Sequence, residues 1–356
     1  MRTFECHCCQ PPSRLFFDNT RCTVCHAEVG WCPVCSSVTA LIPQGAEYRC
    51  ANPVCGVTLV KCFNNAHHGV CNRLLTPREA ARYQGLCDCC RHNKVIPDLS
   101  IDGHRERWAA LEAAKRRLFY TLDLMGLPHP APQDEAPLPL RFAFMADALP
   151  DQGQWRATDS GETVYTGHAE GLITINLKEA DDVERERLRV DLNEPLRTLI
   201  GHFRHEIGHY YWDLLIKGRE EAASRAVFGD HDAPTYAEAL ARYYAEGPAA
   251  NWSERYVSAY ATMHPWEDFA ETFSLYEDIV SVLDTAGDLG LPRVAPDSGV
   301  DAMILVFQRV GVGLNELNRE MGLLDVVPVI ITPAIRDKLA YVHDLVTRAA
   351  ATPPRG

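Results

Sequence analysis

Residues 194–217 read Glu-Pro-Leu-Arg-Thr-Leu-Ile-Gly-His-Phe-Arg-His-Glu-Ile-Gly-His-Tyr-Tyr-Trp-Asp-Leu-Leu-Ile-Lys. Apolar residues recur in this stretch at steps of three and four, which predicts one helix with a strongly apolar face. Pro195 has no N–H group, and only the first turn of a helix leaves that group without a partner, so we place the helix start there. The rest of the fold must supply a core that covers the apolar face.

The motif His205-Glu206-Ile207-Gly208-His209 lies inside this helix. Residues four apart stand one above the other on a helix, so both imidazoles can face one metal ion while Glu206 faces the neighbouring side. Zinc accepts two such nitrogens, needs a third protein ligand, and keeps its fourth position for a water whose proton Glu206 could take. The alternative is a buried helix with incidental polar residues, which is disfavoured because burying His202 and both motif histidines without partners is costly.

A third ligand must come from elsewhere, and we look for it after His209. The acidic and histidine candidates there are Asp213, Asp230, His231, Asp232, His264, Glu267, Asp268 and Glu271. A ligand on a second helix closes a tetrahedron better than Asp213, which lies on the same helix. Pro265 can begin such a helix, on which Glu267 and Glu271 share one face at a spacing of four. One of these carboxylates can bind zinc while the other holds a ligating imidazole from outside.

All 14 cysteines lie between Cys6 and Cys90. In a reducing compartment such a cluster indicates metal ligation rather than a disulfide framework. Cys6-x-x-Cys9 and Cys22-x-x-Cys25 have zinc-ribbon spacing, in which two tight knuckles close one tetrahedral site. The order along the chain then gives a second set, Cys32, Cys35, Cys50 and Cys55, and a third set, Cys62, Cys71, Cys87 and Cys90.

Some assignments within the cysteine-rich region stay open. Cys8 could replace its neighbour Cys9, Cys89 could replace Cys90, and His67 or His68 could substitute for a thiolate. Free thiols or a redox cluster are alternatives to structural zinc. We favour zinc because the region has too few apolar residues to offset the entropy of ordering so many loops.

Length and charge predict two domains, residues 1–98 and residues 99–356. The 356 residues are 46% hydrophobic, and the net charge is −13, although residues 1–100 carry ten Lys and Arg against seven Asp and Glu. The acidic body argues against a protein built chiefly to coat nucleic acid. A basic cluster around Tyr83 is either an ordinary solvated face or a recognition surface. Its members are Arg73, Arg78, Arg82, Arg91 and Lys94.

Periodicity outlines the body of the chain. We expect helices over 104–125, 235–246, 252–284 (with a break at His264-Pro265), 299–318 and 333–348, and strands over 140–146 and 171–177. By analogy with zinc hydrolases that carry this motif, the second strand would border the cleft. The start of the chain lacks the features of a signal peptide, and no stretch approaches 18 uninterrupted apolar residues. We therefore expect a soluble, cytoplasmic α+β protein with a small sheet and no membrane association.

His205-Glu206-x-x-His209 followed by Glu267-Asp-Phe-Ala-Glu271 resembles the gluzincin metallopeptidases, particularly small bacterial members and toxin-type relatives. The resemblance implies that Glu267 is the third zinc ligand, that Glu271 supports a ligand from outside, and that Tyr260 stabilises the oxyanion. Core packing of Tyr260 and a surface or capping role of Glu271 are the alternatives. His202 and His264 are better explained as structural residues, His264 at a helix start.

Further segments are similar to a family of uncharacterised bacterial zinc-binding metallopeptidases with an N-terminal zinc ribbon. These segments are 114–118, 201–213, 258–261 and 264–272. The similarity covers essentially the whole chain and implies a multi-zinc ribbon domain followed by a mainly helical, zincin-like domain. The family's pattern has equivalents of the first and third cysteine sets only. Whether Cys32, Cys35, Cys50 and Cys55 bind a further zinc therefore stays open.

These features predict a zinc-dependent peptidase with Glu206 as general base, one catalytic zinc, two or three structural zinc ions, and a peptide or protein substrate. The second hypothesis is an adaptor, in which the ribbons bind nucleic acid or protein and the zincin body is a scaffold. An intermediate is a protease that its ribbon recruits to a partner. Salt-dependent nucleic-acid binding by residues 1–100 would favour the adaptor or the recruited protease.

Overall fold

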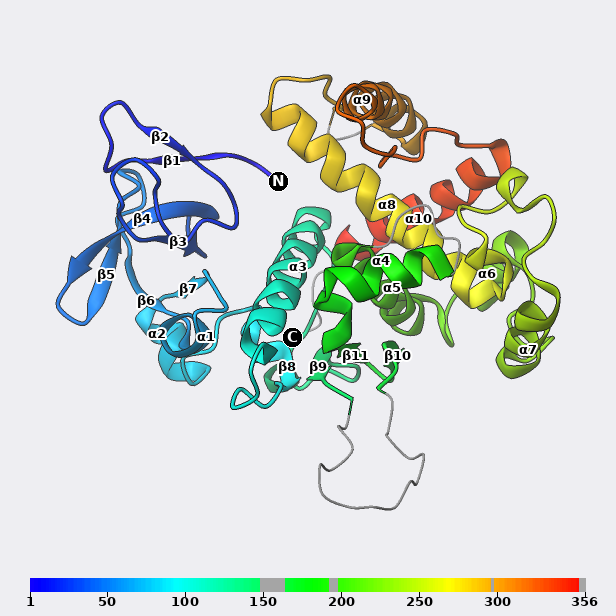
Figure 1. Cartoon of the computed structure of the whole chain (residues 1–356), viewed down its shortest axis with the longest axis horizontal. Coiled ribbons are helices and arrows are strands. Elements are labelled where there is room, and N and C mark those ends of the chain that lie inside the picture. Colours follow the sequence, from blue (N-terminus) through cyan, green and yellow to red (C-terminus); the bar gives the residue numbers. More distant parts are fainter. Residues whose placement is uncertain (148–163, 192–197, 296–297, 352–356) are drawn as a thin grey trace, which may run out of the picture. The chain divides into compact units, whose positions relative to one another are not determined.

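The computed structural model describes residues 1–147, 164–191, 198–295 and 298–351 (Figure 1). The chain forms two compact units. The cysteine-rich unit comprises Thr3–Arg117 and Pro130–Leu199, and the helical unit comprises Met1–Arg2, Leu118–His129 and Ile200–Gly356. A cysteine-rich β region comes first, and mainly helical structure with a small sheet follows, so the fold is α+β as expected. The predicted domain boundary after residue 98 stays a prediction.

Short strands build the first part of the cysteine-rich unit. One sheet pairs β1 (Phe4–Cys6) antiparallel with β2 (Ser13–Leu15). A five-stranded antiparallel sheet has the order β3-β4-β5-β6-β7. Its strands are β3 (Val29–Cys32), β4 (Ser37–Gln44), β5 (Glu47–Cys50), β6 (Thr58–Lys61) and β7 (Leu74–Leu75). Cysteines end β1, β3 and β5, so the strands lead directly into the knuckles.

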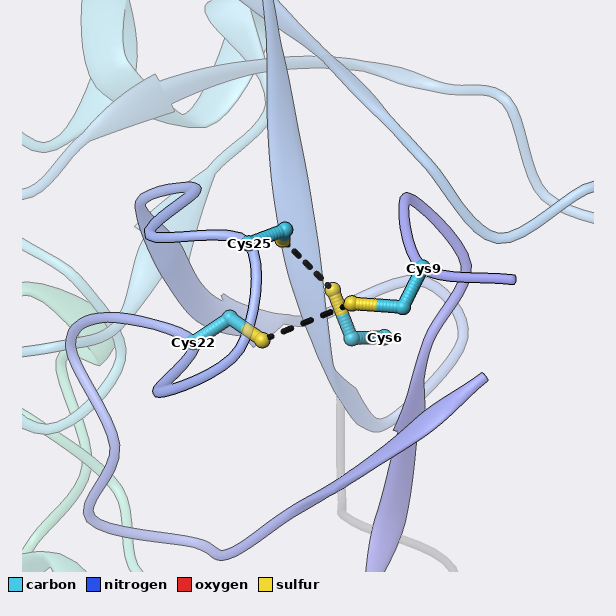
Figure 2. Close-up of side chains that lie close together, drawn as sticks. All are labelled: Cys6, Cys9, Cys22 and Cys25. Carbon is cyan, nitrogen blue, oxygen red and sulfur yellow. Dashed lines mark hydrogen bonds between the residues drawn. The ribbon is translucent and has the colours of Figure 1, made fainter. Parts of the chain in front are cut away.

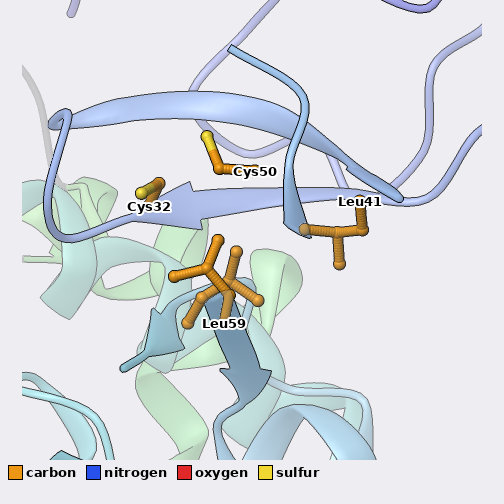
Figure 3. Packing of buried hydrophobic residues seen from close by; sticks show 5 residues of the cluster. Cys32, Leu41, Cys50 and Leu59 are labelled. Carbon is orange, nitrogen blue, oxygen red and sulfur yellow. The ribbon is translucent and has the colours of Figure 1, made fainter. Parts of the chain in front are cut away.

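A small apolar cluster lies within the five-stranded sheet. It consists of the buried residues Leu41, Leu59 and Leu74 together with Cys32 and Cys50 (Figure 3). Cysteine side chains therefore form part of the core itself. This composition agrees with the shortage of apolar residues that the sequence shows in this region.

Helices and a third sheet complete the cysteine-rich unit. The sheet has the order β10-β11-β9-β8, and β9 pairs parallel with both β8 and β11. The strands are β8 (Asn93–Val95), β9 (Arg141–Met145), β10 (Gly167–Ala169) and β11 (Leu172–Asn176). The helices and 3-10 turns are α1 (Phe63–His68), α2 (Pro77–Arg82), η1 (Cys90–His92), α3 (His104–Met125), η2 (Pro132–Asp134), η3 (Leu177–Ala180) and α4 (Asp182–Asp191). The last residues of α3 belong to the helical unit.

The helical unit is organised around α8 (Pro265–Asp288), against which α6, α9, α10 and η6 pack. The other elements are α5 (Leu199–Tyr211), the π-helical turn η4 (Trp212–Ile216), α6 (Glu221–Phe228), α7 (Tyr236–Glu246), η5 (Trp252–Glu254), η6 (Tyr260–Thr262), α9 (Val300–Glu320) and α10 (Pro333–Ala351). Aromatic contacts join α5, α6 and α8, since Tyr211 stacks on Phe273 and Phe228 packs on Phe269. None of the described helices is long and apolar enough to cross a membrane.

Two of the predicted helices differ from the observed ones in their bounds. The predicted helix over 194–217 is described from residue 198, so its start at Pro195 lies outside the described residues. Its α-helical part ends at Tyr211, after which η4 continues as a π-helix. The predicted helix over 252–284 begins only at Pro265, because a proline cannot continue a helix from the preceding turn and the residues before it form η5 and η6.

Candidate metal centres

Helices α5 and α8 lie in close contact at Gly208, inside the His-Glu-x-x-His motif. A Cβ atom at this position would lie 2.8 Å from Cα of Ala270 and 3.0 Å from its carbonyl oxygen. Real Cβ atoms do not tolerate the shorter distance, so the backbones can come this close only because residue 208 is a glycine. The close approach brings the motif face of α5 against the N-terminal half of α8.

His205 and His209 of α5 converge with Glu267 of α8. The two Nε2 atoms are 3.1 Å apart, and Oε2 of Glu267 lies 3.0 Å from Nε2 of His205 and 3.3 Å from Nε2 of His209. In a tetrahedral site with zinc bonds of about 2.0–2.1 Å, neighbouring ligand atoms are about 3.3 Å apart. Both the donor types and their spacing therefore fit zinc, with three protein ligands.

Glu271 holds the far side of the His205 ring. Its Oε1 accepts a hydrogen bond from Nδ1 of His205 at 2.6 Å, which directs Nε2 toward Glu267. Burial acts to lower the pKa of His205, but Glu267 and Glu271 raise it well above its usual value. Conversely, burial acts to raise the pKa of Glu267, and His209 and His205 hold it well below its usual value. The carboxylates of Glu267 and Glu271 thus favour a positive charge next to them. A metal cation bound by the imidazoles would also supply that charge.

Glu206 is buried on α5 beside the converging groups. Its Oε2 atom has no hydrogen-bond partner among the described residues. Burial raises the pKa of Glu206, whereas the neighbouring charges of His205 and His209 act to lower it. A buried carboxyl group with a raised pKa and an unpaired oxygen is suited to accepting and returning a proton.

Aromatic side chains surround the converging groups. The ring of Tyr260 lies 6.0 Å from the ring of His205, and burial raises the pKa of Tyr260, so its hydroxyl stays protonated. The ring of Trp266 packs against His209 at a tilt of 37°, with 3.7 Å between centroids. Tyr236 donates a hydrogen bond to Oε1 of Glu267 at 2.9 Å. Tyr236 was not predicted from the sequence, because no motif spacing links it to Glu267.

The remaining candidates for the third ligand lie in other contacts. Four acidic residues pair with basic side chains, Asp213 with Lys217, Asp230 and Asp232 with Arg225, and Asp268 with Lys338. The ring of His231 packs on Trp212. His264 begins α8 by accepting a hydrogen bond from the N–H of Trp266, so its predicted place at a helix start is confirmed. Within the described part of the chain, Glu267 is the candidate that completes a group with both histidines.

The cysteines form three groups of four, with the predicted memberships 6/9/22/25, 32/35/50/55 and 62/71/87/90. The Sγ atoms are 3.6 Å apart for Cys6 and Cys25 and 3.7 Å apart for Cys9 and Cys22 (Figure 2). Two pairs of the second group are each 3.9 Å apart, and one pair of the third is 3.8 Å apart. Tetrahedral Zn–S bonds of about 2.3 Å require about 3.8 Å between sulfurs, whereas a disulfide requires about 2.05 Å. All three groups fit zinc.

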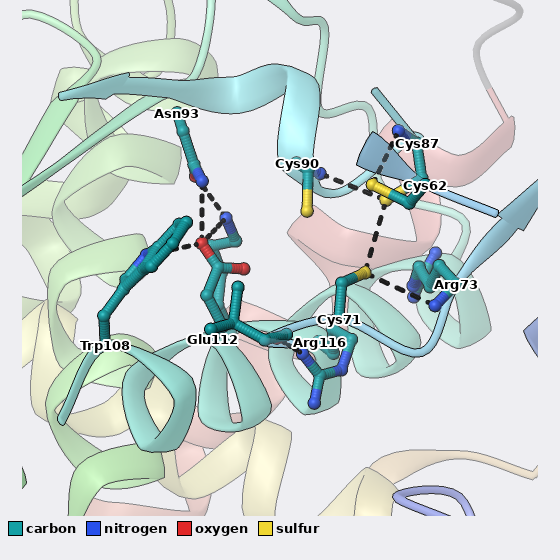
Figure 4. Close-up of polar contacts among 11 residues, drawn as sticks. Cys62, Cys71, Arg73, Cys87, Cys90, Asn93, Trp108, Glu112 and Arg116 are labelled. Atoms are coloured by element: carbon teal, nitrogen blue, oxygen red, sulfur yellow. Dashed lines mark hydrogen bonds and ion pairs between the residues drawn. The ribbon is translucent and has the colours of Figure 1, made fainter. Parts of the chain in front are cut away.

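Two buried arginines lie beside Cys71 of the third group (Figure 4). Arg73 is fully buried, and its backbone N–H donates to Sγ of Cys71 at 3.3 Å. Arg116 of α3 is also buried and donates Nη1–H to the carbonyl oxygen of Val70 at 2.7 Å. Hydrogen bonds from Cys62 and the other thiols hold the pKa of Cys71 well below its usual value, and Arg116 adds to the effect. Zinc with four thiolates carries a net charge of about −2, which these guanidinium groups would offset.

Two cysteines lie outside the three groups. Cys8 is exposed, whereas Cys89 is fully buried, and burial raises the pKa of the Cys89 thiol to about 12. The geometry therefore favours Cys9 over Cys8 and Cys90 over Cys89. His67 and His68 pack against Phe63 and Trp108 and are not part of the groups.

The basic cluster around Tyr83 is only partly an open surface. Arg73 is buried, which removes it from that surface. The guanidinium groups of Arg82 and Arg91 lie 5.0 and 4.5 Å from the centre of the Tyr83 ring, and Arg91 also pairs with Asp134 at 3.6 Å. Arg78, Arg82 and Lys94 are exposed.

The first part of the chain has three four-cysteine groups, and two later helices bring together two histidines and a glutamate. These features are typical of a zinc-binding protein with a ribbon domain and a His-Glu-x-x-His helix. The chain belongs to the family described as "Putative zinc-binding metallo-peptidase", whose model matches residues 104–345. A zinc-ribbon domain model matches residues 3–101.

Two relatives illustrate the extent of the similarity. The "Uncharacterized protein Rv2568c" of Mycobacterium tuberculosis (strain ATCC 25618 / H37Rv) is 35% identical over 361 residues, which cover 98% of this chain and 96% of the relative. The "Uncharacterized protein Mb2598c" of Mycobacterium bovis (strain ATCC BAA-935 / AF2122/97) has the same identity and coverage. No solved structure matches the chain.

Proposed function

We propose that this protein is a zinc-dependent metallopeptidase of the gluzincin type, which hydrolyses peptide bonds in a peptide or protein substrate. His205, His209 and Glu267 would hold the catalytic zinc. The observation that carries the proposal is the convergence of two imidazole nitrogens and one carboxylate oxygen, with no pair more than 3.3 Å apart, beside the buried Glu206.

The residues around the zinc have separate roles in this proposal. Zinc bound there supplies Lewis-acid activation of a water molecule and of the peptide carbonyl. Glu206 takes a proton as general base and passes it to the leaving amine, a role that its buried, unpaired oxygen supports. Tyr260 donates a hydrogen bond to the developing oxyanion, a contact typically worth roughly 3 kcal/mol. Glu271 keeps the His205 ring oriented through Nδ1.

The three four-cysteine groups would hold structural zinc, because four thiolates leave no open position for a substrate or a water. Reduced thiolates are maintained in the cytoplasm, which we propose as the location. The ribbon domain would have a structural role or would bring the enzyme to a protein or nucleic-acid partner. The exposed side chains of Arg78, Arg82 and Lys94 favour such a partner. The same side chains support the alternative function, a non-catalytic adaptor.

Metal counting on the full-length protein tests the proposal. Four candidate sites predict four zinc ions per chain in the wild type and three in His205→Ala. Glu206→Gln should keep all the zinc and should cleave a mixed peptide library about 10²–10⁴-fold more slowly, with the fragments quantified by mass spectrometry. If the wild type carries three zinc ions and His205→Ala two, the middle four-cysteine group does not bind zinc.

Two results would contradict the peptidase. The first is a zinc content that His205→Ala leaves unchanged, since the histidine site would then hold no metal. The second is hydrolysis that Glu206→Gln does not slow. If the protein cleaves no peptide but binds nucleic acid in a salt-dependent way, the adaptor is the correct function.

A further inference from the structure

Helix α7 carries a residue that contacts the candidate zinc ligand although most of the helix is exposed. Among the α7 residues, all of which the structure describes, only Ala239 is buried. The first residue of α7, Tyr236, nevertheless donates its hydroxyl proton to Oε1 of Glu267 at 2.9 Å. The contact joins residues 31 positions apart, on two helices.

The hydrogen bond from Tyr236 determines how Glu267 can bind a metal. Oε2 of Glu267 faces both imidazole nitrogens, while Oε1 is engaged by the Tyr236 hydroxyl. With one oxygen occupied in this way, the carboxylate presents a single oxygen to a metal between the histidines. Without this hydrogen bond, the Glu267 carboxylate could rotate or offer both oxygens to the metal. Its binding geometry would then no longer be fixed.

Several contacts hold Tyr236 in place. Thr235 caps the start of α7, and its side chain and backbone exchange hydrogen bonds with Glu238. The Tyr236 ring packs edge-on against Trp266 and His264, with centroids 5.6 and 5.4 Å apart. The hydroxyl direction is therefore set by a capped helix end and by two rings at the start of α8.

We propose that Tyr236 is a positioning residue of the zinc site, which fixes Glu267 as a ligand through one oxygen. The proposal rests on the proposed zinc site but not on hydrolysis. Hydrogen-bonded partners of metal ligands typically change metal affinity by about 10–100-fold when they are removed. Tyr236→Phe keeps the ring and its packing and removes only the hydroxyl, so it isolates this contribution.

The test measures zinc affinity in full-length Tyr236→Phe by competition with a chelator that leaves the four-cysteine groups loaded. We expect the weakest-held zinc to bind about 10–100-fold less tightly than in the wild type. Tyr244→Phe is the matched control, because Tyr244 lies on the same helix and is 73% exposed. It should bind zinc with wild-type affinity.

A purely structural role for Tyr236 predicts a different pattern. The Tm of Tyr236→Phe would then fall equally in the wild-type and His205→Ala backgrounds, with unchanged zinc affinity, and this result would overturn the proposal. Our proposal predicts that Tyr236→Phe has no effect on the zinc that remains in His205→Ala. If Glu206→Gln shows that the protein is not a peptidase, the zinc affinity of Tyr236→Phe still decides the positioning role independently.

Discussion

The histidine site on α5 and the third four-cysteine group both have the ligand spacing of zinc, but their surroundings are opposite. The histidine site has three ligand groups, all from α5 and α8, and a buried glutamate with an unpaired oxygen beside them. The third cysteine group has four thiols, all buried, and two buried arginines close to it. The first arrangement would leave a bound zinc one open coordination position, whereas four thiolates would fill every position of a zinc in the second, and the arginines would offset its charge.

The difference shows how each site depends on the fold. The histidine site depends on the distance between two long helices whose own packing does not need a metal. The third cysteine group lies among short strands and turns, and part of the core next to them is made of cysteine. We therefore expect metal loss to affect activity at the first site and folding at the second.

The largest expected effect is that of Cys71→Ser. Structural zinc sites contribute on the order of 10 kcal/mol to folding, so losing a ligand of the third group should remove one zinc and unfold the cysteine-rich unit. Circular dichroism, limited proteolysis and zinc counting would detect the change, while His205→Ala should lose one zinc without unfolding.

Cys8→Ser is the control for this prediction, because Cys8 is exposed and lies outside the groups. It should keep the wild-type zinc content and Tm. Folded Cys71→Ser with a full complement of zinc would remove the proposed distinction between the two sites.

A smaller effect is expected for Arg116→Met. The guanidinium is buried and lowers the pKa of Cys71, so its removal leaves a buried charge without compensation and should destabilise the protein by about 3 kcal/mol. Denaturant unfolding gives the change, and chelator competition should show weaker zinc binding at the third group.

Arg105→Met is the matched control on the same helix. Its side chain is 60% exposed and pairs with the neighbouring Glu106. No measurable change in zinc binding is expected. If Arg116→Met and Arg105→Met had equal effects on stability and zinc binding, the buried guanidinium would not be what compensates the charge of the third cysteine group.

Gly208→Ala should have the smallest effect on stability and should act only on the histidine site. The new Cβ would push α5 away from Ala270, at a typical cost of about 1–3 kcal/mol, and would separate Glu267 from the histidines. We expect a lower Tm and weaker zinc binding at this site, with the four-cysteine groups still loaded.

Gly313→Ala on α9 is the control, since a Cβ there meets no atom within 4 Å. It should be neutral or stabilise the protein by up to about 1 kcal/mol. If Gly208→Ala matched Gly313→Ala in Tm and in zinc affinity, the close approach of the helices would not be what assembles the site.

The sequence predicted the parts of the site that follow from local spacing. Helical periodicity placed His205 and His209 on one face, and the spacing of Glu267 and Glu271 on a helix begun by Pro265 placed both carboxylates together. The cysteine groups followed from pairs on tight knuckles and from their order along the chain. In each case a short spacing along the chain determines how the side chains lie relative to one another.

The parts that sequence could not predict depend on contacts between distant segments. Nothing in the spacing of Tyr236 indicates that it reaches Glu267. The place of Arg116 beside Cys71 depends on the position of α3. The predicted basic cluster wrongly included Arg73, because the sequence does not show which basic side chains are buried. The π-helical turn η4 likewise has no signal in an apolar pattern that continues through it.

That turn determines what the motif helix offers beyond His209. A regular α-helix would bring Asp213 onto the face of His205 and His209, since each of these residues follows the last by four. The wider π turn begins at Trp212 and changes the register, and Asp213 instead pairs with Lys217 at 3.6 Å. Asp213 is thereby engaged in an ion pair with a later residue of the same segment and is not part of the group of His205, His209 and Glu267. A zinc ion held by that group would keep its fourth position for a water molecule or a substrate.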